Sequence, residues 1–222
     1  SGEPESRLLA TLIGRVIAWQ QFMSKGAASL DTEAELGLAG ELYFITLLLN
    51  SGISPEVTLK SWVGPDDAPQ DFLLGNGAIE IKATMSSSGL SVKIGSLEQL
   101  DDSIASPLFL AVIRFASDES GLTLPEMIAL VEKDLEREPI FINYLGDKLR
   151  MAGYLDSHAD QYTRKFHPKE LRIFSVSTDF PRLTPGSIPA GITRASYEIN
   201  LDNSGAFITD ISTALKKLGV TI

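Results

Sequence analysis

Two carboxylates and one lysine lie within residues 71–82, which read Asp-Phe-Leu-Leu-Gly-Asn-Gly-Ala-Ile-Glu-Ile-Lys. These three residues are Asp71, Glu80 and Lys82. Carboxylate oxygens are ligands that Mg²⁺ prefers, and a neighbouring ammonium group can activate water or neutralise developing charge. The combination therefore indicates a Mg²⁺-dependent enzyme that hydrolyses phosphodiester bonds.

The same segment predicts a tight β-hairpin. Residues 72–74 end one strand, the Gly-Asn-Gly sequence at 75–77 favours a turn with positive φ, and residues 78–83 form the next strand. Asp71 comes just before the first strand and therefore lies across the hairpin from the second. The hairpin is expected to bring this carboxylate to the acid and the lysine of the second strand.

Glu80 and Lys82 are expected to share one face of their strand, because side chains alternate along a strand. Ile79 and Ile81 then share the other face and can enter the core. We expect Glu80 and Lys82 to lie side by side at the rim of the sheet. An acid-x-Lys triplet is short, and about one match arises by chance in a chain of this composition. The alternative is therefore an exposed strand with a solvated Glu–Lys pair.

A helix before the hairpin carries a third acid. Thr32 and Glu35 have the spacing of a capping box, which predicts a helix that begins near residue 32 or 33. Apolar residues at helical spacing predict its buried stripe, which comprises Leu38, Leu42, Ile45 and Leu49. Glu41 lies within this stretch, flanked by Gly37 and Gly40.

The two glycines need an explanation, because a glycine inside a helix costs about 1 kcal/mol relative to alanine. We expect a strand or a phosphate backbone to come close to the helix on the Glu41 side. The alternative is a solvated Glu41, with the glycines packed under a neighbouring element.

These residues together resemble the PD-(D/E)XK nuclease superfamily, and more narrowly the bacterial "PD-(D/E)XK motif protein" family of restriction–modification gene neighbourhoods. The resemblance covers most of the chain from about Trp19 onward. Its short blocks follow one another in order at residues 18–22, 37–42, 62–65, 70–72, 79–82, 96–101 and 180–183. One departure is that the Pro-Asp pair of the signature is Gln70-Asp71 here, with Pro69 one position early.

The resemblance implies a role for each residue of the hairpin. Asp71 and Glu80 match the acids that bind the metal ion, and the backbone carbonyl of Ile81 would be a further ligand. Lys82 matches the lysine that orients or activates the attacking water molecule.

Two residues outside the hairpin also match. Glu41 corresponds to an acid that assists the metal site, and Gln99 falls where several superfamily members carry a glutamine after the catalytic strand. The implied fold is α/β, a restriction-endonuclease-like mixed β-sheet flanked by helices. The implied cofactor is Mg²⁺, with Mn²⁺ as a substitute.

The implied activity is that of a DNA endonuclease in restriction or DNA defence. One alternative is a catalytically silent DNA-binding or scaffold subunit of a restriction system. Another is a Mg²⁺ enzyme that acts on RNA or on small phosphoesters, because a fold does not determine its substrate. A cut through both DNA strands usually needs two active sites, so a homodimer on DNA is a reasonable expectation.

The composition limits the classes of protein to consider. A length of 222 residues favours one domain over residues 1–222, with a nuclease core at about 30–118 and a C-terminal extension at about 119–222. The absence of cysteine excludes disulfides and zinc–thiolate sites and is compatible with a cytoplasmic location. The longest apolar run, residues 108–113, stops at Arg114, so no membrane span is expected.

The net charge of −10 counts against simple DNA binding, which needs local positive charge. Residues 148–172 are locally basic and could contact a phosphate backbone; the basic residues are Lys148, Arg150, Arg164, Lys165, Lys169 and Arg172. The alternative is a solvated surface, with other subunits of a restriction system supplying most of the DNA contact.

The remaining pattern predicts an alternation of helices and strands. Helices are expected at residues 8–23, 123–138, 141–151 and 207–218, and a short helix capped by Ser96 is expected to carry Gln99. Strands are expected at residues 57–62, 90–94, 108–115, 171–176 and 196–201. The most apolar of these, 108–115, is expected to be a central strand buried on both faces.

Overall fold

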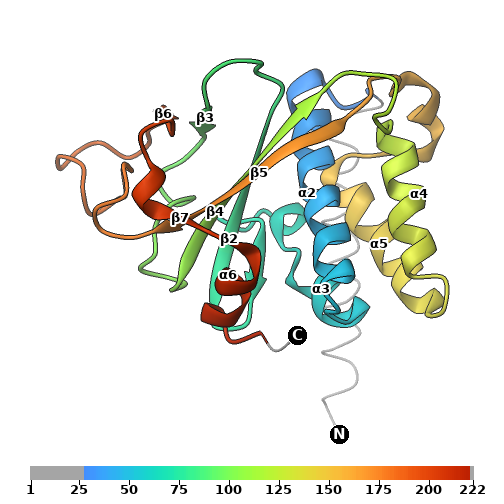
Figure 1. Cartoon of the computed structure of the whole chain (residues 1–222), viewed down its shortest axis with the longest axis horizontal. Coiled ribbons are helices and arrows are strands. Elements are labelled where there is room, and N and C mark those ends of the chain that lie inside the picture. Colours follow the sequence, from blue (N-terminus) through green and yellow to red (C-terminus); the bar gives the residue numbers. More distant parts are fainter. Residues whose placement is uncertain (1–27, 221–222) are drawn as a thin grey trace, which may run out of the picture.

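A mixed β-sheet with helices on one face and a small second sheet on the other forms the body of the protein (Figure 1). The computed structural model describes residues 28–220. The helix expected at 8–23 and the motif at 18–22 lie outside the described residues. The arrangement confirms the expected α/β class, a mixed sheet flanked by helices.

The main sheet has five strands in the order β1-β2-β4-β5-β7. β1 and β2 form an antiparallel hairpin, β4 runs parallel to β2, and β5 and β7 continue the sheet in antiparallel pairs. The strands are β1 (Phe72–Leu74), β2 (Gly77–Thr84), β4 (Leu108–Ala116), β5 (His167–Val176) and β7 (Ile208–Thr209). β4 is central and buried on both faces, as its apolar sequence predicts.

The expected hairpin is present, with a turn of two residues. Gly75 and Asn76 form the turn, and only Gly75 has a positive φ, at 62°. Gly77 is the first residue of β2 rather than part of the turn. A side chain there is excluded, because a Cβ atom would lie 2.0 Å from the carbonyl oxygen of Pro107. The turn docks on the end of α6 (Ile211–Lys217), since the Asn76 N–H donates to the Leu218 carbonyl.

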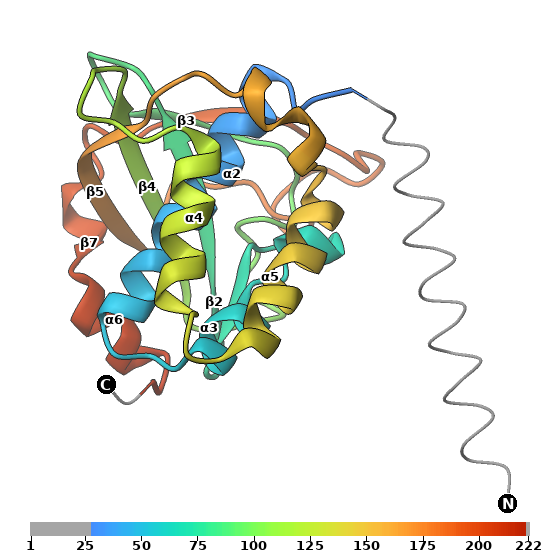
Figure 2. The same cartoon turned by 90° about the vertical axis from the view of Figure 1, so that its right-hand side faces the viewer.

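A layer of helices covers one face of this sheet (Figure 2). The helices are α2 (Thr32–Asn50), α3 (Pro55–Ser61), α4 (Leu124–Asp134) and α5 (Pro139–Ala152). α2 packs directly on β2, and its buried apolar stripe joins Ile79 and Ile81 in one core. No helix in the described part of the chain is long and apolar enough to cross a membrane.

The start of α2 differs from the expected capping box. Asp31 is the N-cap, and its carboxylate accepts from the backbone N–H groups of Glu33 and Ala34. Glu35 therefore makes no capping contact. Its carboxylate is buried and pairs with Arg164 at 3.1 Å.

Three other expected elements are wrong. Residues 57–61 belong to helix α3 and not to a strand, because the Ser54 side chain caps the helix and Pro55 occupies its first turn; Trp62 alone is extended and forms an isolated bridge with Phe72. Residues 96–101 form turns rather than a helix. The helix expected at 207–218 is preceded by a 3₁₀ turn and by β7, so it begins only at Ile211.

The second sheet consists of β3 (Ser91–Ile94) and β6 (Tyr197–Asn200), which pair antiparallel. Val92 and Ile199 from these strands pack with Leu110 and Phe174 of the main sheet in a second core. The face of β2 that carries Glu80 is directed to this side. The second sheet covers this face of the hairpin, and α2 covers the face with Ile79 and Ile81.

Candidate active site

The hairpin brings Asp71 and β2 together through a hydrogen bond. Asp71 Oδ2 accepts from the backbone N–H of Ile81 at 2.7 Å. The N–H and C=O groups of a strand residue point to the same edge of the strand. β1 starts at Phe72, opposite Ile79, so it does not cover this edge at Ile81, and the Ile81 carbonyl faces the uncovered part. An acid and a backbone carbonyl therefore meet at the open part of this edge.

Glu80 and Lys82 share the opposite face of β2 from the isoleucines, but the expected position at the rim of the sheet is wrong for Glu80. Glu80 is 1% exposed, and its Oε1 lies 2.7 Å from the ammonium nitrogen of Lys82, whose side chain is 19% exposed. Glu80 Oε2 accepts no hydrogen bond from any residue within 28–220. A buried carboxylate oxygen without a donor is costly unless a ligand completes it.

The segment 95–100 explains why this face is covered. Gln99 Oε1 accepts from the Gly95 N–H at 2.7 Å and from the Lys82 ammonium group at 3.3 Å, so Lys82 donates to Gln99 and forms an ion pair with Glu80. Leu97 and Leu100 are buried and anchor the segment. Gln99 reaches Lys82 from a turn, not from the helix that the sequence predicts.

Gln70 is a residue of this region whose role sequence reasoning missed. It is 2% exposed, and its side-chain amide donates to the backbone carbonyl of Glu98 at 2.8 Å. This bond ties the residue before Asp71 to the residue before Gln99. The partner is a backbone group in a distant segment, so the sequence carries no signal for the contact.

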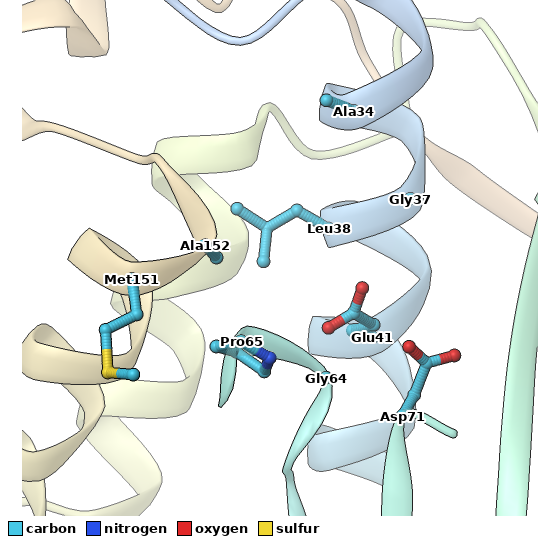
Figure 3. A pocket seen from close by; sticks show the side chains of 9 residues that line it. All are labelled: Ala34, Gly37, Leu38, Glu41, Gly64, Pro65, Asp71, Met151 and Ala152. Atoms are coloured by element: carbon cyan, nitrogen blue, oxygen red, sulfur yellow. The ribbon is translucent and has the colours of Figure 1, made fainter. Parts of the chain in front are cut away.

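Glu41 lies on the other side of Asp71, where α2 faces a pocket of about 240 Å³ (Figure 3). Trp62, a second residue missed from the sequence, is fully buried and donates its indole N–H to Glu41 Oε2 at 2.5 Å. The pocket is lined by Ala34, Gly37, Leu38, Glu41, Gly64, Pro65, Asp71, Met151 and Ala152. Figure 3 shows the carboxylates of Glu41 and Asp71 near each other at one end of it.

The turn at Gly64–Asp66 closes this side of the pocket. A Cβ atom on Gly64 would lie 2.9 Å from Asp71 Oδ1 and 3.4 Å from Glu41 Oε2, so only glycine lets the backbone come this close to both acids. Asp66 forms an ion pair with the buried Lys148 of α5, which holds the turn against that helix.

The acids of the site resist ionisation in this conformation. Burial, together with the nearby Asp71 carboxylate, raises the pKa of Glu41 to about 8, against the smaller effects of Trp62 and Lys82. Burial and Asp71 likewise raise the pKa of Glu80 well above its usual range, and burial raises that of Asp71. Burial lowers the pKa of Lys82, but Glu80 and the other acids outweigh it and the pKa is raised.

These directions predict a pH-dependent stability in the presence of a chelator. A carboxyl whose pKa is raised on folding favours the protonated folded state. The stability from Glu41 is therefore fully present below pH 4.5 and is lost as the pH rises to about 8. We expect the melting temperature, followed by circular dichroism in EDTA, to fall between pH 5 and pH 8. The melting temperature of Glu41→Gln should fall less over this range. Parallel curves of melting temperature against pH for both proteins would contradict this prediction.

The donors at the edge of β2 suit a hard cation. Within residues 28–220 no group of three or more His, Asp or Glu side chains is arranged to hold a metal ion. Mg²⁺, however, is usually held by one or two carboxylates and keeps several water molecules. Asp71, Glu80 with its unpartnered oxygen, and the Ile81 carbonyl are the groups that would make up such a set. Glu41 is placed on the far side of Asp71, beside the pocket.

The basic segment 148–172 is largely neutralised within the fold. Each of its basic side chains forms an ion pair: Lys148 with Asp66, Arg150 with Asp147, Arg164 with Glu35, Lys165 with Glu119, Lys169 with Asp118 and Arg172 with Glu170. A phosphate backbone would therefore have to compete with these acids.

Comparison with known proteins gives one match. A family model described as "Putative PD-(D/E)XK family member, (DUF4420)" matches residues 1–202. Searches of curated proteins and of solved structures find no match. The match includes all five candidate residues, Glu41, Asp71, Glu80, Lys82 and Gln99.

Proposed function

Because the chain belongs to this PD-(D/E)XK family, we propose that it is a metal-dependent DNA endonuclease that hydrolyses phosphodiester bonds. The observation that carries the proposal is the buried Glu80, which lies beside Lys82 and has an oxygen without a hydrogen-bond donor in the described chain. A carboxylate in this state is suited to a cation and is hard to explain as a solvated surface pair.

Asp71, Glu80 and the Ile81 carbonyl would hold Mg²⁺, or Mn²⁺ in its place, with Glu41 supporting the site. A bound divalent cation supplies an activated water molecule and stabilises the charge that develops on the phosphate. The chain's own contribution is to fix these oxygens on rigid elements, since β2 is paired to β4 and α2 packs against it.

We assign to Lys82 the role of orienting the attacking water molecule, and not the role of removing a proton from that water. Its pKa is raised by the acids around it, so the side chain stays protonated and donates hydrogen bonds. Of its three N–H groups, one donates to Gln99 and one is directed towards Glu80 in the ion pair. The third can be directed to a water molecule or to the phosphate.

The ion-paired basic segment supports a second candidate, a catalytically silent DNA-binding or scaffold subunit of a restriction system. With its basic side chains engaged by acids, the chain would depend on companion subunits, or on a second copy of itself, for much of its contact with DNA. The intact acids and lysine favour the nuclease.

A plasmid assay separates the two. We expect supercoiled DNA to be nicked or linearised in Mg²⁺ or Mn²⁺, and not in EDTA. RNA and a chromogenic phosphodiester, tested in parallel, report the substrate class. DNA binding without cleavage in either metal, together with no Mn²⁺ binding, would favour the silent subunit and contradict the nuclease.

A further inference from the structure

The two glycines near Glu41 in α2 have different surroundings. A Cβ atom on Gly40 would lie 3.0 Å from Ala83 Cβ and 3.4 Å from Ile81 Cγ2, so Gly40 permits the close packing of α2 on β2. A Cβ atom on Gly37 would have no neighbouring atom of the described chain within 4 Å. The packing reason expected from the sequence therefore holds for Gly40 and not for Gly37.

Gly37 instead lies on the wall of the pocket that ends at Glu41 and Asp71 (Figure 3). Ala34, Gly37 and Glu41 follow one another at helical spacing, so they share the face of α2 that lines the pocket. The volume of about 240 Å³ is several times the roughly 30 Å³ that a water molecule occupies in the liquid. The pocket can thus admit a group much larger than water.

We propose that Gly37 keeps this pocket open for the sugar–phosphate backbone of the nucleic-acid substrate and thereby determines which phosphodiesters reach the acids. The inference rests on the proposed nuclease function and concerns the same site. In a nucleic acid, the nucleotides on either side of the reacting phosphodiester must pass the pocket wall at Gly37. A small diester needs only the space next to Glu41 and Asp71.

The direction of helical side chains gives the inference a selective test. A side chain at position 37 leans towards the N-terminus of α2, and so towards Ala34 and away from Glu41. The Glu41 carboxylate is held by Trp62 and lies beside Gly64, so a leucine that leans towards Ala34 should fill part of the pocket without displacing this carboxylate. It should obstruct a polymer while it leaves the metal ligands and a small substrate unaffected.

The experiment compares Gly37→Leu with Gly146→Leu. Gly146 is a half-buried glycine of α5, and the atom nearest to its Cβ position is the mobile end of Arg150 at 3.6 Å. It lines a different pocket. The readouts are plasmid cleavage, hydrolysis of bis(p-nitrophenyl) phosphate with the same metal, and the melting temperature. Gly37→Leu should lose plasmid cleavage by about a hundred-fold with small-diester hydrolysis unchanged, and Gly146→Leu should lose neither.

The melting temperature of alanine variants shows whether Gly37 borders an open pocket or is needed for packing. Gly37→Ala should raise the melting temperature by roughly 2–4 °C, because alanine favours the helix and meets no atom of the described chain. Gly40→Ala should gain less than Gly37→Ala, because its methyl group would lie 3.0 Å from Ala83 Cβ and β2 would have to shift by a few tenths of an ångström. A lower melting temperature for Gly37→Ala would assign Gly37 a packing role and overturn the inference.

The remaining outcomes distinguish this inference from the function on which it rests. If the wild type cleaves DNA and Gly37→Leu cleaves it equally well, the inference alone is wrong. Loss of both activities in Gly37→Leu also overturns it, because the acids are then affected. If the wild type hydrolyses neither substrate with either metal, the proposed function fails and the inference fails with it.

Discussion

Replacement of Lys82 by methionine is expected to abolish DNA cleavage and to lower the melting temperature at neutral pH. The loss of cleavage follows from the loss of the donor that orients water, which typically costs about 10²–10³-fold or more. The loss of stability follows from Glu80, which is 1% exposed and has Lys82 as its cation at 2.7 Å. Ionisation of a buried carboxyl that has lost its partner cation costs about 3–5 kcal/mol.

The two effects of Lys82→Met can be separated by pH. Without the ammonium group, the pKa of Glu80 rises further above its usual range, so the folded protein binds the proton more tightly. The destabilisation is therefore small at pH 5 and grows as the pH rises. At pH 8 we expect a decrease in melting temperature of roughly 10 °C, measured by differential scanning fluorimetry in EDTA.

The matched control is the double variant Glu80→Gln/Lys82→Met, which removes both charges. It should recover most of the melting temperature at pH 8 and remain inactive. If the double variant is as unstable as Lys82→Met, the loss comes from packing and not from the unpaired carboxylate. Plasmid cleavage by Lys82→Met at the wild-type rate would remove the role assigned to the lysine.

The sequence alone places Glu80 and Lys82 at the rim of the sheet, where the loss of the lysine would leave folding intact. The hairpin itself was predictable, since the turn residues and the alternation are local. The burial of Glu80 was not. It depends on the segment 95–100, which is held in place by the Gln70 contact with Glu98.

The other differences have the same physical origin. Thr32 and Glu35 fit a capping box locally, but Glu35 pairs with Arg164, which is distant in the sequence, and Asp31 takes the capping role. At residues 57–62 the apolar pattern suggested a strand, although Ser54 and Pro55 carried a helix-start signal that the structure follows. Contacts between distant segments, and competition between two local signals, limit what the sequence predicts.

Replacement of Glu80 by glutamine is expected to stabilise the protein while it removes metal binding and activity. The pKa of Glu80 is raised by burial and by Asp71, so its ionised form opposes folding, and this opposition grows as the pH rises above the ordinary carboxyl range. Glutamine resembles the protonated side chain and carries no such penalty, and Lys82 keeps Gln99 and the nearby acids Asp71 and Glu41 as partners. In EDTA at pH 8, the melting temperature of Glu80→Gln should exceed that of the wild type, and at pH 5 the two should nearly coincide.

Addition of metal should reverse this order. A cation that binds only the folded state stabilises it by RT ln(1 + [L]/Kd), which is about 2.7 kcal/mol at a concentration of one hundred times Kd. Wild type titrated with Mn²⁺ should therefore gain melting temperature, while Glu80→Gln should not, and isothermal titration calorimetry should show binding to the wild type alone. Active sites commonly retain unfavourable charge that a bound ligand relieves. If Glu80 is a metal ligand, the Glu80→Gln protein should therefore be stable, bind no metal ion and be inactive. A Glu80→Gln protein that is less stable than wild type at pH 8 and binds Mn²⁺ equally well would show instead that the Glu80–Lys82 pair only supports the fold.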